Sequence, residues 1–180
     1  MAAMPAPVLN TPRLVLTGHA PDDHDAMTAM WAEPAVHALI TGRAFTREET
    51  WQRLLRYVGH WQALGLGNWL IRETASGRLV GEAGFMDSRR VSEPDFAGTP
   101  EVGWALAGWA QRRGFAREAL AAILAWGDAR GIARTMCIIH PANLRSIALA
   151  EDLGYRLVAA GRYQDAPILL HARDADPAMG

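Results

Sequence analysis

Two segments of the chain repeat their apolar residues at the spacing of an amphipathic helix. The first follows Thr46-Arg47-Glu48-Glu49, which has the pattern of a capping box, and its apolar face holds Trp51, Leu54, Leu55, Val58 and Trp61. The second covers 114–129 and stops before Gly131; its apolar face holds Phe115, Ala119, Leu120, Ile123 and Trp126. Shorter helices are predicted over 21–31 and 143–153.

Runs of strand length alternate with these helices. They cover 14–16, 68–73, 79–86, 101–106, 135–139, 155–159 and 167–171. The resulting order, β-α-α-β-β-β-α-β-α-β-β, predicts an α/β (α+β) fold in which helices cover a mixed sheet. Residues 1–12 are rich in Pro and Ala and are expected to form a loose arm. Because no repeat or linker divides the chain, 1–180 is expected to be a single domain.

Composition narrows the class of protein. The net charge is -1, so no basic excess points to nucleic acid, and no apolar run is long enough to span a membrane. All 18 basic residues are Arg, which leaves no Lys for a P-loop or a Schiff base. The one cysteine, Cys137, and an N-terminus unlike a signal peptide favour the cytoplasm. The six histidines lack paired metal-ligand spacing, so no metal is expected.

The segment from Val102 to Ala116 reads as a strand, a loop and a helix start. Backbone N–H groups without partners and the positive end of the helix dipole make such a start an anion site, suited to a pyrophosphate. Gly114 lets a phosphate approach the backbone, and Arg112 and Arg113 can add charge-assisted contacts. The alternative is an ordinary helix start whose glycine permits close packing. Neither a P-loop nor a Rossmann fingerprint is present.

Several motifs in this order resemble the Gcn5-related N-acetyltransferases, the GNAT superfamily. Gln111-Arg112-Arg113-Gly114-Phe115-Ala116 is similar to its Gln/Arg-x-x-Gly-x-Gly/Ala signature, and Val102-Gly103-Trp104-Ala105-Leu106 resembles its bulged fourth strand. Asn143-Leu144-Arg145-Ser146 followed by Leu153-Gly154-Tyr155-Arg156 resembles its Asn-x-x-Ser and Leu-Gly-Phe/Tyr segment. The opening Thr11-Pro12-Arg13-Leu14-Val15-Leu16 is similar to the RimJ/RimL branch.

The resemblance implies a mostly antiparallel sheet, with helices on both faces, that is splayed between its fourth and fifth strands. The pyrophosphate of acetyl-CoA would lie on the segment formed by Gln111, Arg112, Arg113, Gly114, Phe115 and Ala116. The pantetheine would pair with the backbone near Trp104, Ala105 and Leu106, and Asn143 would hold it with its side-chain amide. A β-bulge is a reasonable cause of the splaying.

Acetyl transfer to an amine needs a base, stabilisation of the carbonyl oxygen and a proton for the leaving thiolate. Glu101, at the start of the fourth strand, is the first candidate base, against the alternative of a solvated strand end. Glu82 is the second, with a pKa that apolar surroundings would raise, against a solvent-facing position. The family's usual tyrosine acid is replaced by Ala150, so Ser146 is the candidate acid; locally, its hydroxyl would instead bond to the backbone. The charged residues of the loop 87–100, among them Arg89 and Arg90, are expected to be solvated; the alternative is that this loop, which leads into the fourth strand, shapes acceptor binding.

The expected function is transfer of an acetyl group from acetyl-CoA to a primary amine, on a protein N-terminus or a small molecule, in a ternary complex. A non-catalytic CoA-binding sensor is the alternative, and the missing tyrosine favours it. A nucleotide-binding protein is the third possibility, which the lack of Lys disfavours. The acceptor amine is the expected partner, without nucleic acid or membrane, and edge strands near the C-terminus are compatible with a homodimer.

Overall fold

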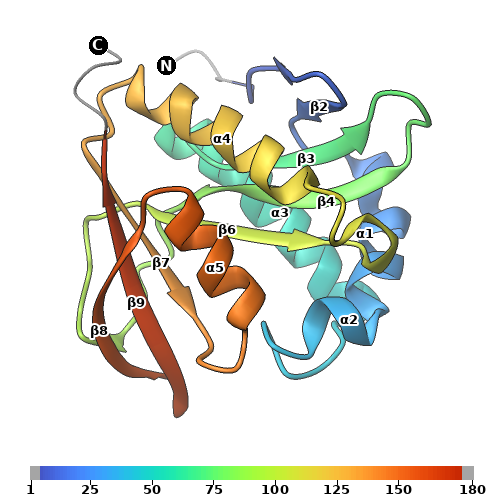
Figure 1. Ribbon diagram of the computed structural model, residues 1–180. Helices are drawn as coiled ribbons and strands as arrows, with labels where there is room; N and C mark the ends of the chain where they lie inside the picture. The colour runs from blue at the N-terminus through green and yellow to red at the C-terminus, as the bar shows by residue number, and fades with distance from the viewer. Residues whose placement is uncertain (1–4, 176–180) are drawn as a thin grey trace.

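Nine strands form one sheet in the computed structural model, which describes residues 5–175 (Figure 1). The strands follow the order β1-β2-β3-β4-β6-β7-β9-β8-β5, and each neighbouring pair is antiparallel except β6 with β7. Their bounds are β1 Leu9–Asn10, β2 Leu14–Thr17, β3 Asn68–Glu73, β4 Leu79–Met86, β5 Ser92–Glu93, β6 Glu101–Leu106, β7 Arg134–Ile139, β8 Arg156–Tyr163 and β9 Ala166–Asp174. The predicted α/β class and the mostly antiparallel sheet are therefore confirmed.

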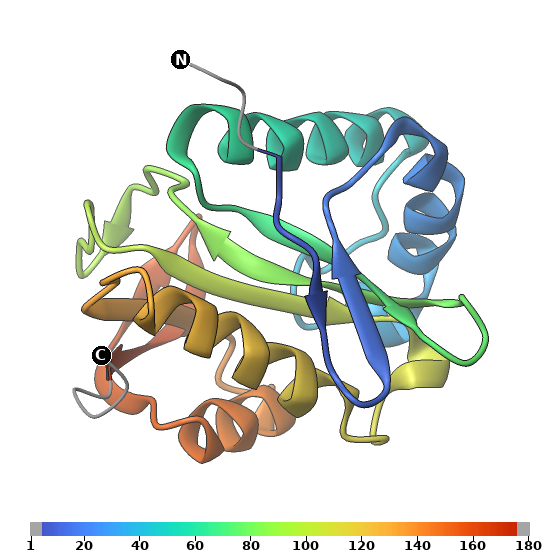
Figure 2. The ribbon, with the colours of Figure 1, turned by 90° about the horizontal axis from the view of Figure 1, so that it is seen from above.

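Helices cover both faces of this sheet, as the view from above shows (Figure 2). They are α1 His24–Ala32, α2 Pro34–His37, α3 Arg47–Leu64, α4 Phe115–Asp128 and α5 Leu144–Asp152, with short 3₁₀ turns at Pro21–Asp23 and Gly108–Ala110. On one face α3 buries Leu54 and Tyr57 against Leu70 and Met86. On the other, α4 contributes Phe115, Ala119, Leu120 and Ile123 to the largest buried cluster.

The capping box predicted for the long helix α3 is confirmed. The amide of Glu49 donates to Thr46 Oγ1 over 3.1 Å, and the amide of Thr46 donates to Glu49 Oε2 over 2.8 Å. These two bonds satisfy N–H groups that the first turn of a helix cannot satisfy itself. At the other end Gly65 adopts a left-handed conformation, φ 68°, that stops the helix.

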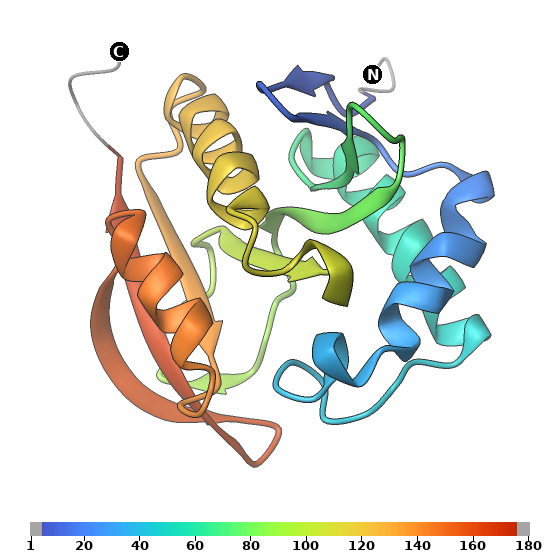
Figure 3. The same ribbon diagram turned by 45° about the vertical axis from the view of Figure 1, so that its right-hand side comes forward.

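Strands β6 and β7 separate almost as soon as they meet. Their one register pair is Glu101 with Met136, supported by a hydrogen bond from the Met136 amide to the Pro100 carbonyl. Figure 1 shows the two strands diverging beyond that point, and Figure 3 shows α4 and α5 on either side of the opening. The splayed sheet is thus confirmed. The expected bulge in β6 is wrong, because β4 and β6 keep continuous register from Gly81↔Leu106 to Met86↔Glu101.

The N-terminal arm is not loose in its described part. Leu9 and Asn10 pair with β2, and the Trp69 indole donates to the Pro7 carbonyl over 2.7 Å. Thr11 Oγ1 donates to Glu118 Oε1 over 2.6 Å, which ties the arm to α4. The prediction failed because these partners lie far away in sequence. Residues 1–4 lie outside the described part.

The C-terminal strands are longer than predicted. β8 and β9 form a hairpin whose turn is Gln164 and Asp165, both with positive φ, so the first strand extends to Tyr163 and the second starts at Ala166 and ends at Asp174. Within residues 5–175, no helix combines the length and apolar character needed to cross a bilayer.

Candidate active site

One cavity of about 770 Å³ connects the gap between β6 and β7 with the space under α3. It brings together side chains from parts of the chain that are distant in sequence. Among those that line it are Trp31, Arg53, Tyr57, Asn68, Glu82, Arg90, Glu101, Trp104, Ala105, His140, Asn143 and Ser146. All three predicted catalytic candidates therefore border the same space.

Two buried carboxylates occupy its floor, Glu82 from β4 and Glu101 from β6, with 2% and 5% of their surface exposed. Glu82 pairs with Ala105 and Glu101 pairs with Met86, so both side chains project from the sheet face that α3 covers. Their positions are separated by four residues along β6, about 13 Å at the rise of a strand. The two carboxylates thus mark different ends of the floor.

Glycines leave the floor open between these carboxylates. Gly84 and Gly103 are cross-strand partners, so this part of the face carries no side chain. A Cβ on Gly103 would lie 2.7 Å from Met86 Cε, closer than packed atoms come. A larger residue here would begin to fill the cavity.

Glu82 is fixed in an ion pair rather than left free to accept a proton. Its Oε1 accepts from Arg53 Nε over 2.8 Å and from the Tyr57 hydroxyl over 2.6 Å. Burial by itself would raise the pKa of Glu82, but the charge of Arg53, together with His19 and Tyr57, outweighs it and lowers that pKa to about 2. The predicted raised pKa of Glu82 is wrong, because the prediction did not include the charge of Arg53 on α3. The alternative of a solvent-facing position is also wrong, because the residue is buried.

Arg53 itself is held by aromatic rings. Its Cζ lies 4.2 Å from the ring centroid of Trp31, 5.3 Å from that of Phe45 and 5.2 Å from that of Tyr57. Burial would lower the pKa of Arg53, but Tyr57 and Glu82 outweigh it and the pKa is raised, so the guanidinium stays charged.

Glu101 stands where β6 and β7 part, which places it at the deep end of the gap. Arg90 Nε donates to its Oε2 over 2.5 Å and Arg90 Nη2 donates to its Oε1 over 3.1 Å. Arg90 has 21% of its side chain exposed, against 82% for Arg89. The expectation of a solvated residue is therefore wrong for Arg90, which comes from the loop 87–100 and completes the site.

The backbone of β6 offers hydrogen-bonding groups to the gap. The Ala107 amide donates to the Val80 carbonyl, so odd-numbered residues of β6 direct their N–H and C=O groups to β4. By this alternation Trp104 and Leu106 direct theirs into the gap, where a bound extended chain can pair with them, although the Leu106 carbonyl already accepts from the Gln111 side chain. Ala105 instead directs its backbone to β4 and contributes a buried methyl group to the cavity wall.

The far side of the gap is the start of α5. Asn143 caps this helix, since its Oδ1 accepts from the Ser146 amide over 3.3 Å. The Asn143 Nδ2 and the Ser146 hydroxyl form no hydrogen bond with the described residues. The local bond from the Ser146 hydroxyl to the backbone, which was the alternative to a role as acid, is thus absent among the described residues. His140 Nδ1 accepts from the Ala142 amide over 3.1 Å.

The predicted phosphate turn lies at the other end of the gap, between Gly108–Ala110 and α4. Arg112 and Gly114 have positive φ, 60° and 79°, which turns the chain sharply into the helix. The first helical bond of α4 runs from the Glu118 amide to the Gly114 carbonyl. The amides of Phe115 and Ala116 lie in the first turn of α4, where N–H groups lack partners within the helix, so this turn can bind an anion.

Contacts from both sides hold this turn in shape. Arg13 donates to the Arg113 carbonyl over 2.9 Å and to Glu118 Oε2 over 2.7 Å. The amide of the Gln111 side chain donates to the carbonyls of Ala35 and Leu106, over 2.9 and 3.1 Å. The Gln111 side chain therefore stabilises the turn by hydrogen bonds. Arg112 and Arg113 are exposed beside it.

The remaining candidates from the sequence are structural. Ala150, in place of the usual tyrosine, is fully buried in the core. Tyr155 is buried with its hydroxyl bonded to that of Thr135 over 2.7 Å, and burial raises its pKa. Burial also raises the pKa of the Cys137 thiol. Among the described residues, no three His, Cys, Asp or Glu side chains are grouped to hold a metal.

Sequence reasoning missed three residues of the site, Arg53, Tyr57 and Arg90. Arg53 and Tyr57 are spaced by four residues on α3, one turn apart, which was a usable signal that they share a face. Nothing in the sequence showed that this face meets Glu82, which is 29 residues from Arg53. Arg90 gave no signal, because its loop has no periodic pattern.

Comparison with known proteins adds independent support. The model of the acetyltransferase (GNAT) domain family matches residues 13–156. A protein from Bordetella pertussis described as a GnaT-family acetyltransferase is 36% identical, with a TM-score of 0.83 over 93% of this chain and 99% of that one. A ribosomal-protein-S5-alanine acetyltransferase from Vibrio fischeri shares the fold at 18% identity, TM-score 0.76, over 96% and 98%. YncA from Salmonella typhimurium, solved with its cofactor acetyl-CoA, shares it at 22%, TM-score 0.69, over 91% and 95%.

Proposed function

Because this chain belongs to the GNAT acetyltransferase family, we propose that it moves an acetyl group from acetyl-CoA to a primary amine. The observation that carries the proposal is the gap between β6 and β7. It opens into a cavity that holds the buried carboxylate of Glu101 and the Ser146 hydroxyl, which has no hydrogen bond with the described residues. The YncA structure contains acetyl-CoA on the same fold, which supports the choice of donor.

The donor would bind along the gap. The amides from Arg112 to Ala116 receive the diphosphate, and the exposed guanidinium of Arg112 adds a charge-assisted contact. The backbone groups of Trp104 and Leu106 pair with the pantetheine amides as an extra strand would. The Asn143 side-chain amide reaches the pantetheine from the other side. This arrangement directs the thioester toward Glu101, at the deep end.

The reaction needs no covalent enzyme intermediate. Glu101 takes a proton from the acceptor ammonium, directly or through a water, and the amine nitrogen then attacks the thioester carbonyl carbon. A C–N bond forms, the nitrogen loses its second proton to water, and the C–S bond breaks. Ser146 donates its hydroxyl proton to the departing sulfur and recovers one from solvent. Glu82 and Glu101 are each paired with an arginine, but only Glu101 lies where β6 and β7 part. Glu82 lies about 13 Å away along the floor and its pKa is about 2, so it is not assigned this role.

The acceptor belongs to the class used by RimJ/RimL-type enzymes, a protein N-terminus or a small primary amine. The motif resemblance and the shared fold with the Vibrio fischeri enzyme, which acts on a ribosomal-protein alanine, support this branch.

Release of free thiol from acetyl-CoA across a panel of amines tests the proposal. We expect turnover with at least one class of primary amine, and a loss of about 100-fold or more in kcat for Glu101→Gln. The acetyl-CoA affinity should be retained in this variant. Binding of acetyl-CoA without turnover of any amine, and with no effect of Glu101→Gln, would instead support a non-catalytic CoA sensor.

A further inference from the structure

The cavity holds a guanidinium that is anchored on one side and open on the other. Arg53 uses Nε for Glu82, and aromatic rings hold its plane. Glu82 is the one carboxylate paired with it in the described part of the chain, through Nε, and 17% of the side chain remains exposed where it lines the cavity. A planar fork of N–H donors held in this way is suited to a carboxylate.

A second arginine beside it lacks a counter-charge. Three of the four arginines that line the cavity are each paired with one carboxylate, Arg43 with Glu49, Arg53 with Glu82 and Arg90 with Glu101. Arg56 is paired with no carboxylate in the described part of the chain. Its Cζ lies 5.6 Å from the ring centroid of Tyr57, and that of Arg53 lies 5.2 Å from the same ring. The α3 wall of the cavity therefore carries uncompensated positive charge.

A buried donor without a partner, on β3, lines the same cavity. Asn68 has 2% of its surface exposed, and its Nδ2 has no hydrogen-bond partner. Asn68 pairs with Gly84 and is therefore diagonal to Glu82 on the same face of the sheet. A buried amide without a partner is costly, so a ligand oxygen that accepts from it gains affinity.

From these three observations we propose that the acceptor amine belongs to a molecule that also carries a carboxylate, and that Arg53 and Arg56 bind this group. Glu82 and Tyr57 act as positioning residues, because they fix Arg53 without facing the reacting atoms. The CoA phosphates are served by the separate turn at 112–116, which follows the far end of β6. The inference rests on the proposed function for its assignment of donor and acceptor.

Matched acceptors test the inference in two pairs. One pair is a free amino acid and its carboxamide; the other is a peptide whose second residue is Asp or Asn. We expect kcat/KM to favour the acid by about 10-fold or more in at least one pair, and the pair that shows it identifies the source of the carboxylate. Equal or greater kcat/KM for the neutral member in both pairs would overturn the inference.

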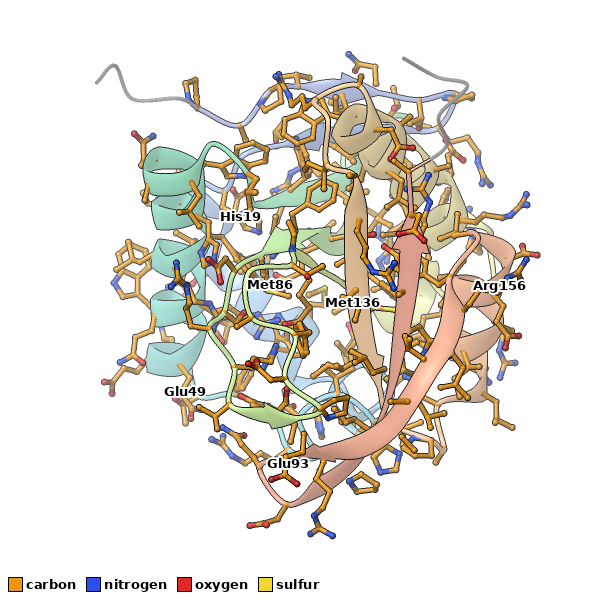
Figure 4. The ribbon with its side chains drawn as sticks, turned by 90° about the vertical axis from the view of Figure 1, so that its left-hand side faces the viewer. His19, Glu49, Met86, Glu93, Met136 and Arg156 are labelled. Carbon is orange, nitrogen blue, oxygen red and sulfur yellow. The ribbon has the colours of Figure 1, made fainter. Side chains whose placement is uncertain are left out.

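Substitutions of single arginines test which side chains cause the preference for the acid over the amide. Arg56→Gln, at an exposed position on α3, should reduce the acid-to-amide ratio of kcat/KM several-fold. Arg53→Lys keeps a charge but loses the fork and should reduce the same ratio. Arg156→Gln removes an arginine far from α3 (Figure 4) and should leave the ratio unchanged. An unchanged ratio in both cavity variants, or an equal reduction in Arg156→Gln, would contradict the assignment.

A binding measurement separates this inference from the proposed function. Titration of the same acids and amides into the CoA-loaded protein should show selective binding of the acid, whether or not transfer occurs. Selective binding without turnover would leave the inference standing and reject the acetyltransferase proposal. Turnover without selectivity for the acid would support the acetyltransferase proposal and reject this inference.

Discussion

Replacing Glu82 by Gln should destabilise the protein by several kcal/mol at neutral pH. The substitution is nearly isosteric, but it leaves the Arg53 guanidinium without its counter-charge in a largely buried position. Breaking one side of a buried ion pair typically costs about 3 to 5 kcal/mol. The fall in the pKa of Glu82 from 4.5 to about 2 gives an independent figure of about 3 kcal/mol.

The pH dependence distinguishes this cause from simple loss of packing. Since the pKa is depressed in the folded state, the stabilisation is complete well above the unfolded value of 4.5 and is lost as the pH falls toward 2. As the pH falls, the wild-type protein loses the stabilisation that ionised Glu82 provides, whereas the Glu82→Gln variant has no such stabilisation at any pH. The difference in free energy of unfolding between them should therefore narrow by more than about 1 kcal/mol between pH about 6 and pH about 3.5.

Urea unfolding of both proteins at each pH is the assay. Other titrating carboxylates affect both proteins alike and cancel in the difference. Glu49→Gln is the matched control, because the pKa of Glu49 is also lowered to about 2, chiefly by Arg43, but this pair is exposed and its loss should cost less. A difference between wild type and Glu82→Gln that is the same at both pH values would refute the reasoning.

Four further substitutions, one of them a control, test the donor turn, the acid and the core. Gly114→Ala and its control Gly131→Ala both place a Cβ at positive φ, 79° and 76°, and should each lower the free energy of unfolding by about 1 kcal/mol. Isothermal titration should show that the affinity for CoA falls about 10-fold in Gly114→Ala alone. Ser146→Ala should lower kcat for thiol release by about 10-fold or more with unchanged KM for acetyl-CoA, and a fall confined to KM would contradict its role as acid. Leu120→Ala removes a fully buried side chain of α4 and should lower the free energy of unfolding by about 2 to 5 kcal/mol. A midpoint of urea unfolding close to that of wild type would show that α4 is not packed as described.

Local signals in the sequence predicted the elements that depend on neighbouring residues. The cap at Thr46, the apolar stripe of α4 and the glycine at the start of that helix all appear where short-range chemistry requires them. Motif order placed Glu101 and Ser146 near one space, and both line the cavity. These are features that spacing of a few residues can carry.

The failures involve pairings across long stretches of chain. The arm at residues 7–12 is ordered by Trp69 and Glu118, and the pKa of Glu82 is reversed by Arg53. Arg90 has no pattern of its own and becomes part of the site only because Glu101 is opposite it. Charge and hydrogen bonding at a site depend on which elements the fold brings together, and periodicity does not contain that information.

The central claim is that CoA enters the gap between β6 and β7, and a crystal structure of the protein with CoA tests it most directly. We expect the diphosphate on the amides of Arg112 to Ala116, and the sulfur between the two strands near Glu101 and Ser146. Density for CoA elsewhere on the protein, or a gap closed by continuous pairing of β6 with β7, would contradict the account.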